Sequence, residues 1–169
     1  MTVEIADMIT PGHEGAFKVG TRNPEPSLRE LPEVHRRLFE DPVTACLATI
    51  TPSGHAQLTP VWVNTDGDHL FLNSTAGRDK DRNLRARPDL TLMLLNPKNA
   101  YHWLTVYGRV VEVIDENDPE RGHLATENID DLAAKYLDQR PYPLRDPAGE
   151  IRVRYAVEPR RVVTFGPVN

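Results

Sequence analysis

Residues 43–75 read VTACLATITPSGHAQLTPVWVNTDGDHLFLNST and decide the fold, because they hold three candidate strands in succession. Each is a run rich in β-branched and apolar residues, which favour an extended backbone. A Pro-Ser-Gly turn separates the first two runs, and Asp66-Gly67 between the last two is a strong hairpin signal. The pattern predicts antiparallel strands over residues 43–51, 55–65 and 69–75.

Pro60 lies inside the second of these runs. Proline has no backbone N–H to give to a neighbouring strand. The position therefore predicts that this strand lies at a sheet edge or carries a bulge there.

Helix signals lie on both sides of this stretch. Pro32 and Pro42 bound a short segment with an apolar stripe, which is typical of a helix near 32–40. Asp118-Pro119-Glu120 offers a cap, a first-turn proline and an early carboxylate, which predict a helix start. Apolar residues then recur at helical spacing, at Ile129, Leu132, Ala133, Tyr136 and Leu137.

Further strands are indicated over residues 90–96 and 103–115, and a bent strand or two strands over 151–166, interrupted near Pro159. Hairpin-linked strands with few helices between them indicate a mainly β (α+β) protein built as a small antiparallel barrel. No GxGxxG or Walker pattern is present, which disfavours the common nucleotide-binding folds.

The chain of 169 residues fits one domain of ordinary size. Residues 1–27 have weak periodicity and end in TRNPEPS, so we interpret them as an extended or flexible N-terminal arm. Residues 28–169 then form the folded domain.

Composition narrows the function classes. Hydrophobic residues make up 39% and charged residues 27% of the chain, and the formal net charge of −5 argues against general binding to nucleic acid or membrane surfaces. No apolar run approaches the roughly 20 residues that a membrane helix needs. The N-terminus lacks the basic region and long apolar core of a secretory signal. We expect a cytoplasmic protein without nucleic-acid or membrane partners.

Cys46 is the single cysteine, which excludes a disulfide framework and a multi-cysteine metal site. It lies within the apolar run VTACLATI. A buried Cys behaves as a small hydrophobe, so we expect a buried structural thiol.

GRDKDRNLRARPDL, at residues 77–90, places five cations within ten positions and reads as a short helix that Pro88 ends. Three of them have ordinary helix explanations. Asp81 and Arg85 are four apart, Asp79 and Arg82 are three apart, and cations such as Arg85 and Arg87 are favoured at a helix C-terminus.

Arg78 and Lys80 lie at the N-terminal end, where the helix dipole is already positive. Free N–H groups and two cations together form a ready site for a phosphate. Ser74 and Thr75 precede them and can add hydroxyl donors. A solvated charge face is the alternative, because Asp79 and Asp81 offset part of the charge.

The combined pattern LATITPSGHAQLTPVWVNTDGDHLFLNSTAGRDKDRNLRARPDLTL (47–92) resembles the pyridoxamine 5'-phosphate oxidase-like split-barrel family of FMN and F420 proteins. WLTVYGRVVEV (103–113) is similar to the family's central strand, and YAVEPRRVVTF (155–165) to its closing strand. The resemblance spans about residues 30–166 and implies an antiparallel split β-barrel of six to seven strands with a few short helices. The family's R-D-P-R segment is replaced by Ala86-Arg87-Pro88-Asp89.

The resemblance also implies a cofactor site. The G-R-x-K-x-R-N-L and P-V-W motifs most resemble the F420-dependent branch, in which Arg78 and Lys80 would hold the cofactor phosphate and Asn83 would assist from the first helical turn. Ser74 and Thr75 would line the same pocket. The segment along the ring system would comprise Gln57, Thr59, Pro60, Val61 and Trp62.

An F420-dependent oxidoreductase that transfers hydride between the deazaflavin and a small organic substrate is the function so implied, acting as a homodimer with cofactor sites at the interface. The alternatives are an FMN-binding oxidoreductase of the same fold and a non-catalytic flavin or tetrapyrrole carrier. The cofactor carries the hydride chemistry, which agrees with the lack of any paired nucleophile and base or paired acid and base carboxylates. Tyr101, His102 and Tyr107 are candidate proton donors, and no metal site is expected.

Overall fold

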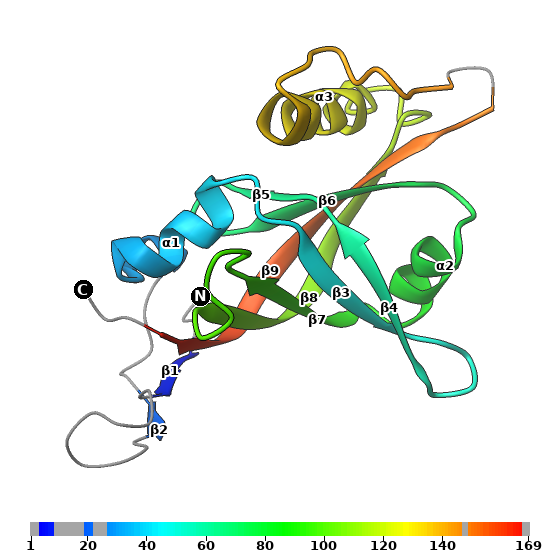
Figure 1. Ribbon diagram of the computed structural model, residues 1–169. Helices are drawn as coiled ribbons and strands as arrows, with labels where there is room; N and C mark the ends of the chain where they lie inside the picture. Colours follow the sequence, from blue (N-terminus) through cyan, green and yellow to red (C-terminus); the bar gives the residue numbers. More distant parts are fainter. Residues whose placement is uncertain (1–3, 9–18, 22–26, 147–148, 167–169) are drawn as a thin grey trace.

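The protein is described by a computed structural model that covers residues 4–8, 19–21, 27–146 and 149–166. Its strands are β1 (Glu4–Met8), β2 (Val19–Thr21), β3 (Ala45–Ile50), β4 (Ala56–Val61), β5 (Val63–Thr65), β6 (Leu70–Thr75), β7 (Asp89–Leu95), β8 (Trp103–Asp115) and β9 (Arg152–Phe165). Its α-helices are α1 (Glu33–Glu40), α2 (Asp79–Ala86) and α3 (His123–Leu137), and a 3-10 turn spans Leu28–Glu30 (Figure 1).

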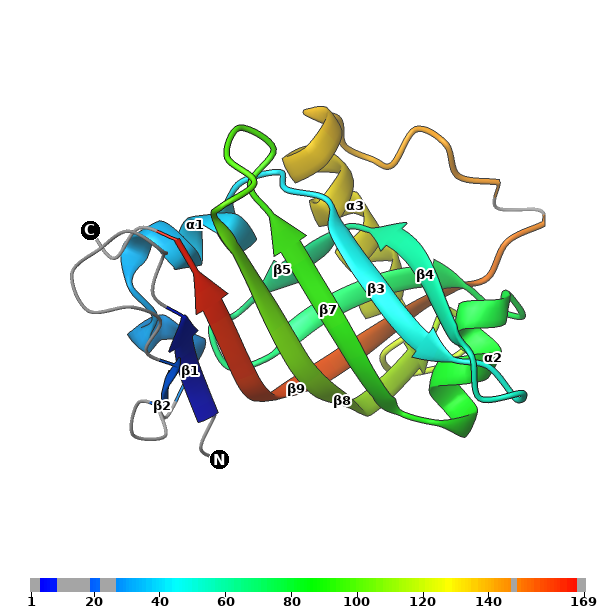
Figure 2. The ribbon, with the colours of Figure 1, turned by 60° about the horizontal axis from the view of Figure 1, so that its bottom comes forward.

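The strands form one strongly curved sheet in the order β2-β1-β9-β8-β7-β3-β4, and β9 also pairs with β6, which pairs with β5 (Figure 2). All of these pairs are antiparallel except β1 with β9, which is parallel. No ladder joins β4 to β6 in the described part of the chain, so the barrel is open between them. This arrangement confirms the prediction of a mainly β split barrel.

The segment predicted as one strand over 55–65 is two strands, which corrects that prediction. β4 pairs with β3, whereas β5 pairs with β6 on the other side of the opening. The chain crosses the opening at Trp62, which belongs to neither strand. Pro60 lies on β4, the last strand of the sheet on that side, so the prediction of an edge position is confirmed.

Cys46 is exposed, so the prediction of a buried thiol is wrong. Successive side chains of a strand point to opposite faces. Ala45 and Leu47 point into the hydrophobic core and are almost fully buried, and Cys46 between them therefore points outward. An apolar run identifies the strand but does not say which face each residue takes.

The helix expected from Asp118 begins later, at His123. Asp118 Oδ1 accepts hydrogen bonds from the N–H groups of Glu120 and Arg121, as a capping residue does, but the turn that it closes precedes the helix. The expected apolar face largely holds, because Ile129, Leu132 and Ala133 are buried.

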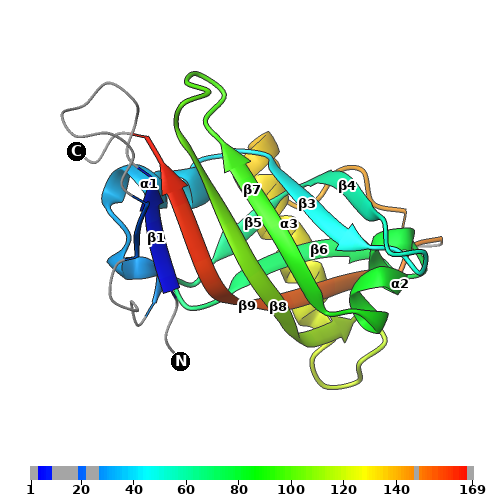
Figure 3. The same ribbon diagram turned by 90° about the horizontal axis from the view of Figure 1, so that it is seen from below.

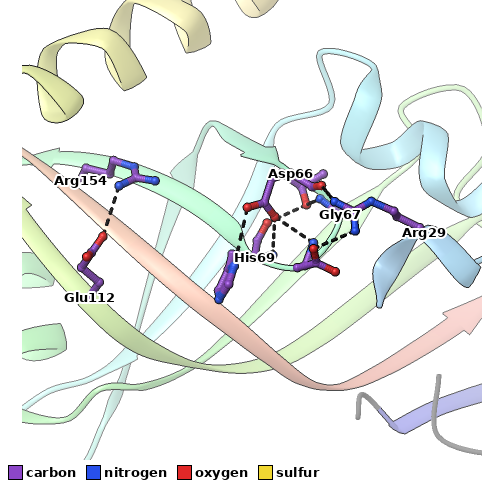
Figure 4. A network of polar contacts seen from close by, with 8 residues as sticks. Arg29, Asp66, Gly67, His69, Glu112 and Arg154 are labelled. Carbon is purple, nitrogen blue, oxygen red and sulfur yellow. Dashed lines mark hydrogen bonds and ion pairs between the residues drawn. The ribbon is translucent and has the colours of Figure 1, made fainter. Parts of the chain in front are cut away.

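The Asp66-Gly67 hairpin is confirmed, and Arg29 holds it from outside (Figure 4). Gly67 has φ 95°, a left-handed conformation that suits glycine. Arg29 Nη1 binds Asp68 Oδ2 at 2.7 Å, and Leu28 N donates to Gly67 O at 2.8 Å. These contacts attach the 3-10 turn to the β5–β6 hairpin.

β9 is continuous through Pro159, which favours the bent-strand alternative over two strands. Its register with β8 shifts where Tyr107 and Gly108 face Arg161 and Pro159, so Arg160 is extra in β9. The strand therefore continues through Pro159, with a bulge at the neighbouring Arg160.

The stretch predicted as an N-terminal arm contains β1, β2 and Ser27, and its residues 1–3, 9–18 and 22–26 lie outside the described part. The boundary at residues 27 and 28 stays a prediction.

The helices occupy different sides of the barrel. α1 and α2 lie at opposite ends, and α3 packs against β6, β8 and β9 (Figures 1 and 2). Figure 3 shows β7 and the adjoining part of β8 with none of the three helices in front of them. None of the described helices is long and apolar enough to cross a membrane.

Candidate functional site

A pocket of about 360 Å³ lies at the opening of the barrel and is lined by residues from the end of β4, from β6, and from α2 and α3. It brings together four of the residues predicted for the site, which are Pro60, Val61, Trp62 and Lys80. The remaining lining residues are Thr44, Asn73, Ile129, Tyr142 and Arg152.

A larger pocket of about 490 Å³ lies at the other end of the barrel, between α1 and the turn from β7 to β8. None of the predicted cofactor residues lines it. Two cations, Arg37 and Lys98, line this larger pocket. They therefore lie at the opposite end of the barrel from α2 and Lys80. His102, a candidate proton donor, is buried beside it, and burial lowers the pKa of its imidazole.

Aromatic rings form one wall of the pocket at the opening. Trp62 stacks on Tyr136 with ring centres 5.1 Å apart, and Tyr142 meets Trp62 edge-on at 6.1 Å. The Tyr136 hydroxyl donates to Val43 O at 2.8 Å and accepts from Val63 N at 3.2 Å. These contacts fix the indole in place, as a planar ligand would require.

Lys80 presents an ammonium group to this pocket from the first turn of α2. Burial lowers its pKa, and the charge of Arg78 lowers it further. No acidic group within the described ranges pairs with it. A half-buried ammonium group next to a second cation favours a bound anion.

Arg78 is the N-cap residue of α2, and its side chain makes no capping hydrogen bond. Its guanidinium lies 3.3 Å from Glu150 Oε1. The structure therefore separates the two predicted phosphate ligands in role: Lys80 lines the pocket, whereas Arg78 contacts a carboxylate at its rim.

Asp81 shapes the turn that carries Arg78 and Lys80. Its carboxylate is buried and accepts hydrogen bonds from Gly77 N at 2.8 Å, Arg85 Nε at 2.8 Å and the Tyr155 hydroxyl at 2.5 Å. Burial acts to raise the pKa of Asp81, but these hydrogen bonds outweigh it and the net shift is downward. The predicted Asp81–Arg85 pair is confirmed, as is the Asp79–Arg82 pair.

Asn83 and Gln57 come together, but beneath α2 and outside the pocket lining. Asn83 Nδ2 donates to Gln57 Oε1 at 3.0 Å and to Thr49 Oγ1 at 3.1 Å. In this arrangement Asn83 attaches α2 to β3 and β4. Thr59 lies on the same face of β4 as Gln57, and its buried hydroxyl makes no hydrogen bond to the described residues.

Ser74 and Thr75 point to opposite sides of β6, since adjacent strand residues alternate, and neither lines the pocket that contains Lys80. Ser74 is opposite Val153 in the core, whereas Thr75 is opposite Arg152. Both hydroxyls are buried and neither finds a hydrogen-bond partner among the described residues. Thr75 thus lies on the face that Asn73 and Arg152 share with the pocket.

The pocket is also lined by three residues that were not predicted from the sequence, Asn73, Tyr142 and Arg152. Asn73 stands two positions before Thr75 and so shares its face, which strand periodicity could have shown. Arg152 meets Thr75 through the pairing of β6 with β9, a register that one sequence does not reveal.

These residues fit a planar, phosphate-bearing cofactor. The aromatic wall suits a ring system, Lys80 and Arg152 supply charge, and the first N–H groups of α2 lack intrahelical acceptors. The unpaired hydroxyl of Thr75 adds a buried donor. The described residues contain no group of three or more His, Cys, Asp or Glu side chains that could hold a metal ion.

Comparisons with known proteins identify the family of the chain. The family model described as pyridoxamine 5'-phosphate oxidase matches residues 31–157. A solved structure of an F420 reductase is 30% identical, with a TM-score of 0.65 over 78% of this chain and 98% of that chain. Curated protein sequences give no match.

More distant structures share the fold alone. A conserved hypothetical protein from Mycobacterium tuberculosis is 22% identical, with a TM-score of 0.52 over 73% of this chain and 76% of that chain. HutZ, a heme storage protein from Vibrio cholerae, is 17% identical, with a TM-score of 0.55 over 79% of this chain and 95% of that chain.

Proposed function

Because the chain belongs to the pyridoxamine 5'-phosphate oxidase family, we propose that the pocket between β4 and β6 binds coenzyme F420 and that the protein is an F420-dependent oxidoreductase acting on a small organic substrate. The observation that carries the proposal is Lys80: an unpaired, half-buried ammonium group at the N-terminus of α2, beside an aromatic wall. The 30% identity to an F420 reductase over nearly the whole of that chain favours F420.

The bound cofactor would supply hydride transfer, and the residues of the pocket would bind and orient it. Lys80, Arg152 and the first amides of α2 would hold the phosphate. Trp62, fixed by Tyr136 and Tyr142, would lie along the ring system and exclude water from one side of it.

FMN is the second candidate, because it carries a phosphate and a planar ring that the same residues would hold. The family description also favours it. The two cofactors differ outside the phosphate, since F420 has an acidic glutamate tail.

A homodimer is the assembly that we propose, with the outer face of the barrel as its interface. Leu58, Ala48, Thr91 and Tyr107 form one outward row across β4, β3, β7 and β8. Leu58 and Tyr107 are exposed, as are Ile50 and Leu95 on the same face. An uncovered apolar sheet face of this kind indicates a protein partner, and a second copy presents the same surface.

The cofactor proposal is tested with protein purified from a host that makes no F420. We expect a colourless protein that quenches the fluorescence of added F420 with micromolar or tighter affinity and binds FMN more weakly. A yellow protein with a bound flavin spectrum would identify FMN instead. F420 binding without turnover of any nitro, enone or quinone substrate would favour the carrier alternative.

A further inference from the structure

Two arginines beside the candidate cofactor pocket share one carboxylate. Glu150 Oε1 lies 3.3 Å from Arg78 Nη2, and Glu150 Oε2 lies 2.8 Å from Arg152 Nη2. The three residues come from separate places: the N-cap of α2, the start of β9 and the segment just before β9. We call Arg78, Arg152 and Glu150 the arginine clamp.

Arg152 needs an anion, because its side chain is only 6% exposed and an unpaired buried charge is costly. Its guanidinium also stacks over the Tyr142 ring at 4.8 Å, next to the aromatic wall. Glu150, at 19% exposed, is the carboxylate that supplies the charge. The arginine is thus held at the edge of the pocket by a group that itself reaches solvent.

Glu150 satisfies this site only in part. Glu150 Oε2 contacts Arg152 without an aligned hydrogen bond, and Arg152 Nε is buried without an acceptor in the described residues. Thr75 Oγ1, opposite Arg152 in the ladder, is also unpaired. A phosphate has three acceptor oxygens and up to two negative charges, so it would satisfy more of these donors than one carboxylate does.

The charges around the clamp also favour a bound phosphate. Arg78, Lys80 and Arg152 are three cations, against one carboxylate in the clamp. The neighbouring acids are engaged elsewhere, since Asp79 pairs with Arg82 and Asp81 with Arg85. The two positive charges in excess would be balanced by the two negative charges of a phosphate dianion.

We propose that Glu150 is an internal counter-anion that occupies the arginine clamp in the free protein and is displaced by the phosphate group of the cofactor, leaving Arg152 as a phosphate ligand. The identity of the cofactor rests on the proposed function, whereas the clamp itself requires only a phosphate. Because the carboxylate and the phosphate compete for the same donors, Glu150 lowers phosphate affinity and favours release of the cofactor.

The test compares the wild-type protein with Glu150→Gln, which keeps the shape of the side chain and removes its charge. Glu112→Gln is the matched control, because Glu112 also joins two arginines, Arg121 and Arg154, and does not line the pocket. Figure 4 shows its contact with Arg154. The first probe is inorganic phosphate, followed by thermal unfolding. The second is the pair FMN and riboflavin, which share a ring and differ by the phosphate.

We expect phosphate to raise the melting temperature of Glu150→Gln more than that of the wild type or Glu112→Gln. We also expect Glu150→Gln to bind FMN about fivefold or more tightly than the wild type, the low end of ordinary coupling between sites, with riboflavin unchanged. Arg152→Lys in the Glu150→Gln background should remove the gain, because a lysine cannot provide the planar fork.

An equal or smaller phosphate effect in Glu150→Gln would overturn the inference. A phosphate effect as expected, in a protein that binds neither FMN nor F420, would keep the clamp and reject the proposed function. If Glu150→Gln shows no larger phosphate effect but FMN and F420 still bind the wild type, the clamp is rejected and the proposed function stands.

Discussion

The Tyr155 hydroxyl donates a hydrogen bond of 2.5 Å to Asp81 Oδ1 in the interior of the protein. Tyr155 lies on the closing strand β9, and Asp81 lies in the first turn of α2. Because Asp81 Oδ2 also accepts from Gly77 N, the contact links β9 to the turn that carries Arg78 and Lys80. Burial and the Asp81 carboxylate both raise the pKa of Tyr155, so the hydroxyl keeps its proton.

Tyr155→Phe should therefore destabilise the protein by about 1–3 kcal/mol, since it leaves a buried carboxylate with one donor fewer. Chemical denaturation measures the loss. Tyr101→Phe removes a hydroxyl from a ring that is 68% exposed and should change the free energy of unfolding little. Equal effects of the two substitutions would contradict the role given to the Tyr155–Asp81 contact.

Much of this fold follows from local sequence signals. Turn residues and strand composition correctly predicted β3, β6, β7 and β8 to within about two residues, because a hairpin is specified by neighbours along the chain. Face assignment was less secure: Cys46 was expected inside and lies outside. Composition cannot decide which face a residue takes, since apolar residues occupy both faces of β3 and β7.

In the candidate site, too, residues with a local sequence signal could be predicted and residues placed by strand pairing could not. Lys80 could be identified because cations at a helix N-terminus are a local anomaly. Glu150 and Arg152 could not be identified, because Glu150 contacts Arg78 across 72 positions of sequence and the pairing of β6 with β9 brings these positions together. The sequence also did not predict that Asn83, expected to assist at the phosphate, binds Gln57 and Thr49.

Lys80→Met should weaken FMN and F420 binding by roughly tenfold or more, since it removes a charge-assisted contact to the phosphate. Riboflavin binding should stay unchanged. Lys98→Met is the control, because Lys98 lines the pocket at the other end of the barrel. If Arg78→Ala and Lys80→Ala together leave the affinity for both cofactors unchanged, the phosphate assignment is wrong.

Lys135 should make stability depend on alkaline pH. Its ammonium group donates to Val63 O at 2.9 Å and to Phe39 O, yet burial lowers its pKa from 10.5 to about 8. Between these two values the unfolded chain binds a proton that the folded protein does not, so stability rises with pH from about 8 to 10.5.

Denaturation at several pH values measures this rise against Lys135→Met, which lacks the titrating group. The difference in unfolding free energy between the two proteins should move in favour of the wild type as the pH passes from 8 to 10.5. A difference that is constant over this range would show that the ammonium group keeps its proton and that the two carbonyl contacts offset its burial.

Gly67→Ala should destabilise more than Gly54→Ala. Gly67 has φ 95° and Gly54 has φ 84°. An alanine at either position must adopt a left-handed backbone conformation, which lowers the free energy of unfolding by about 1 kcal/mol. A Cβ at Gly67 would also lie 2.5 Å from Arg29 Nε, whereas one at Gly54 meets no atom within 4 Å. Combining Gly67→Ala with Arg29→Ala measures how much of the extra loss comes from that clash. An identical loss at both glycines would mean that Arg29 moves aside freely.

Leu58→Asp should convert a dimer into monomers. Leu58 is 65% exposed and lies on the outward row that crosses β4, β3, β7 and β8, so a carboxylate there would be buried against the second copy. Light scattering after size exclusion measures the mass. Leu144→Asp is the matched control, because Leu144 is 70% exposed but lies in the segment between α3 and β9. A wild-type protein that is already a monomer at tens of micromolar would exclude this face as a stable interface, whereas dissociation by Leu144→Asp instead of Leu58→Asp would move the interface to the α3 side.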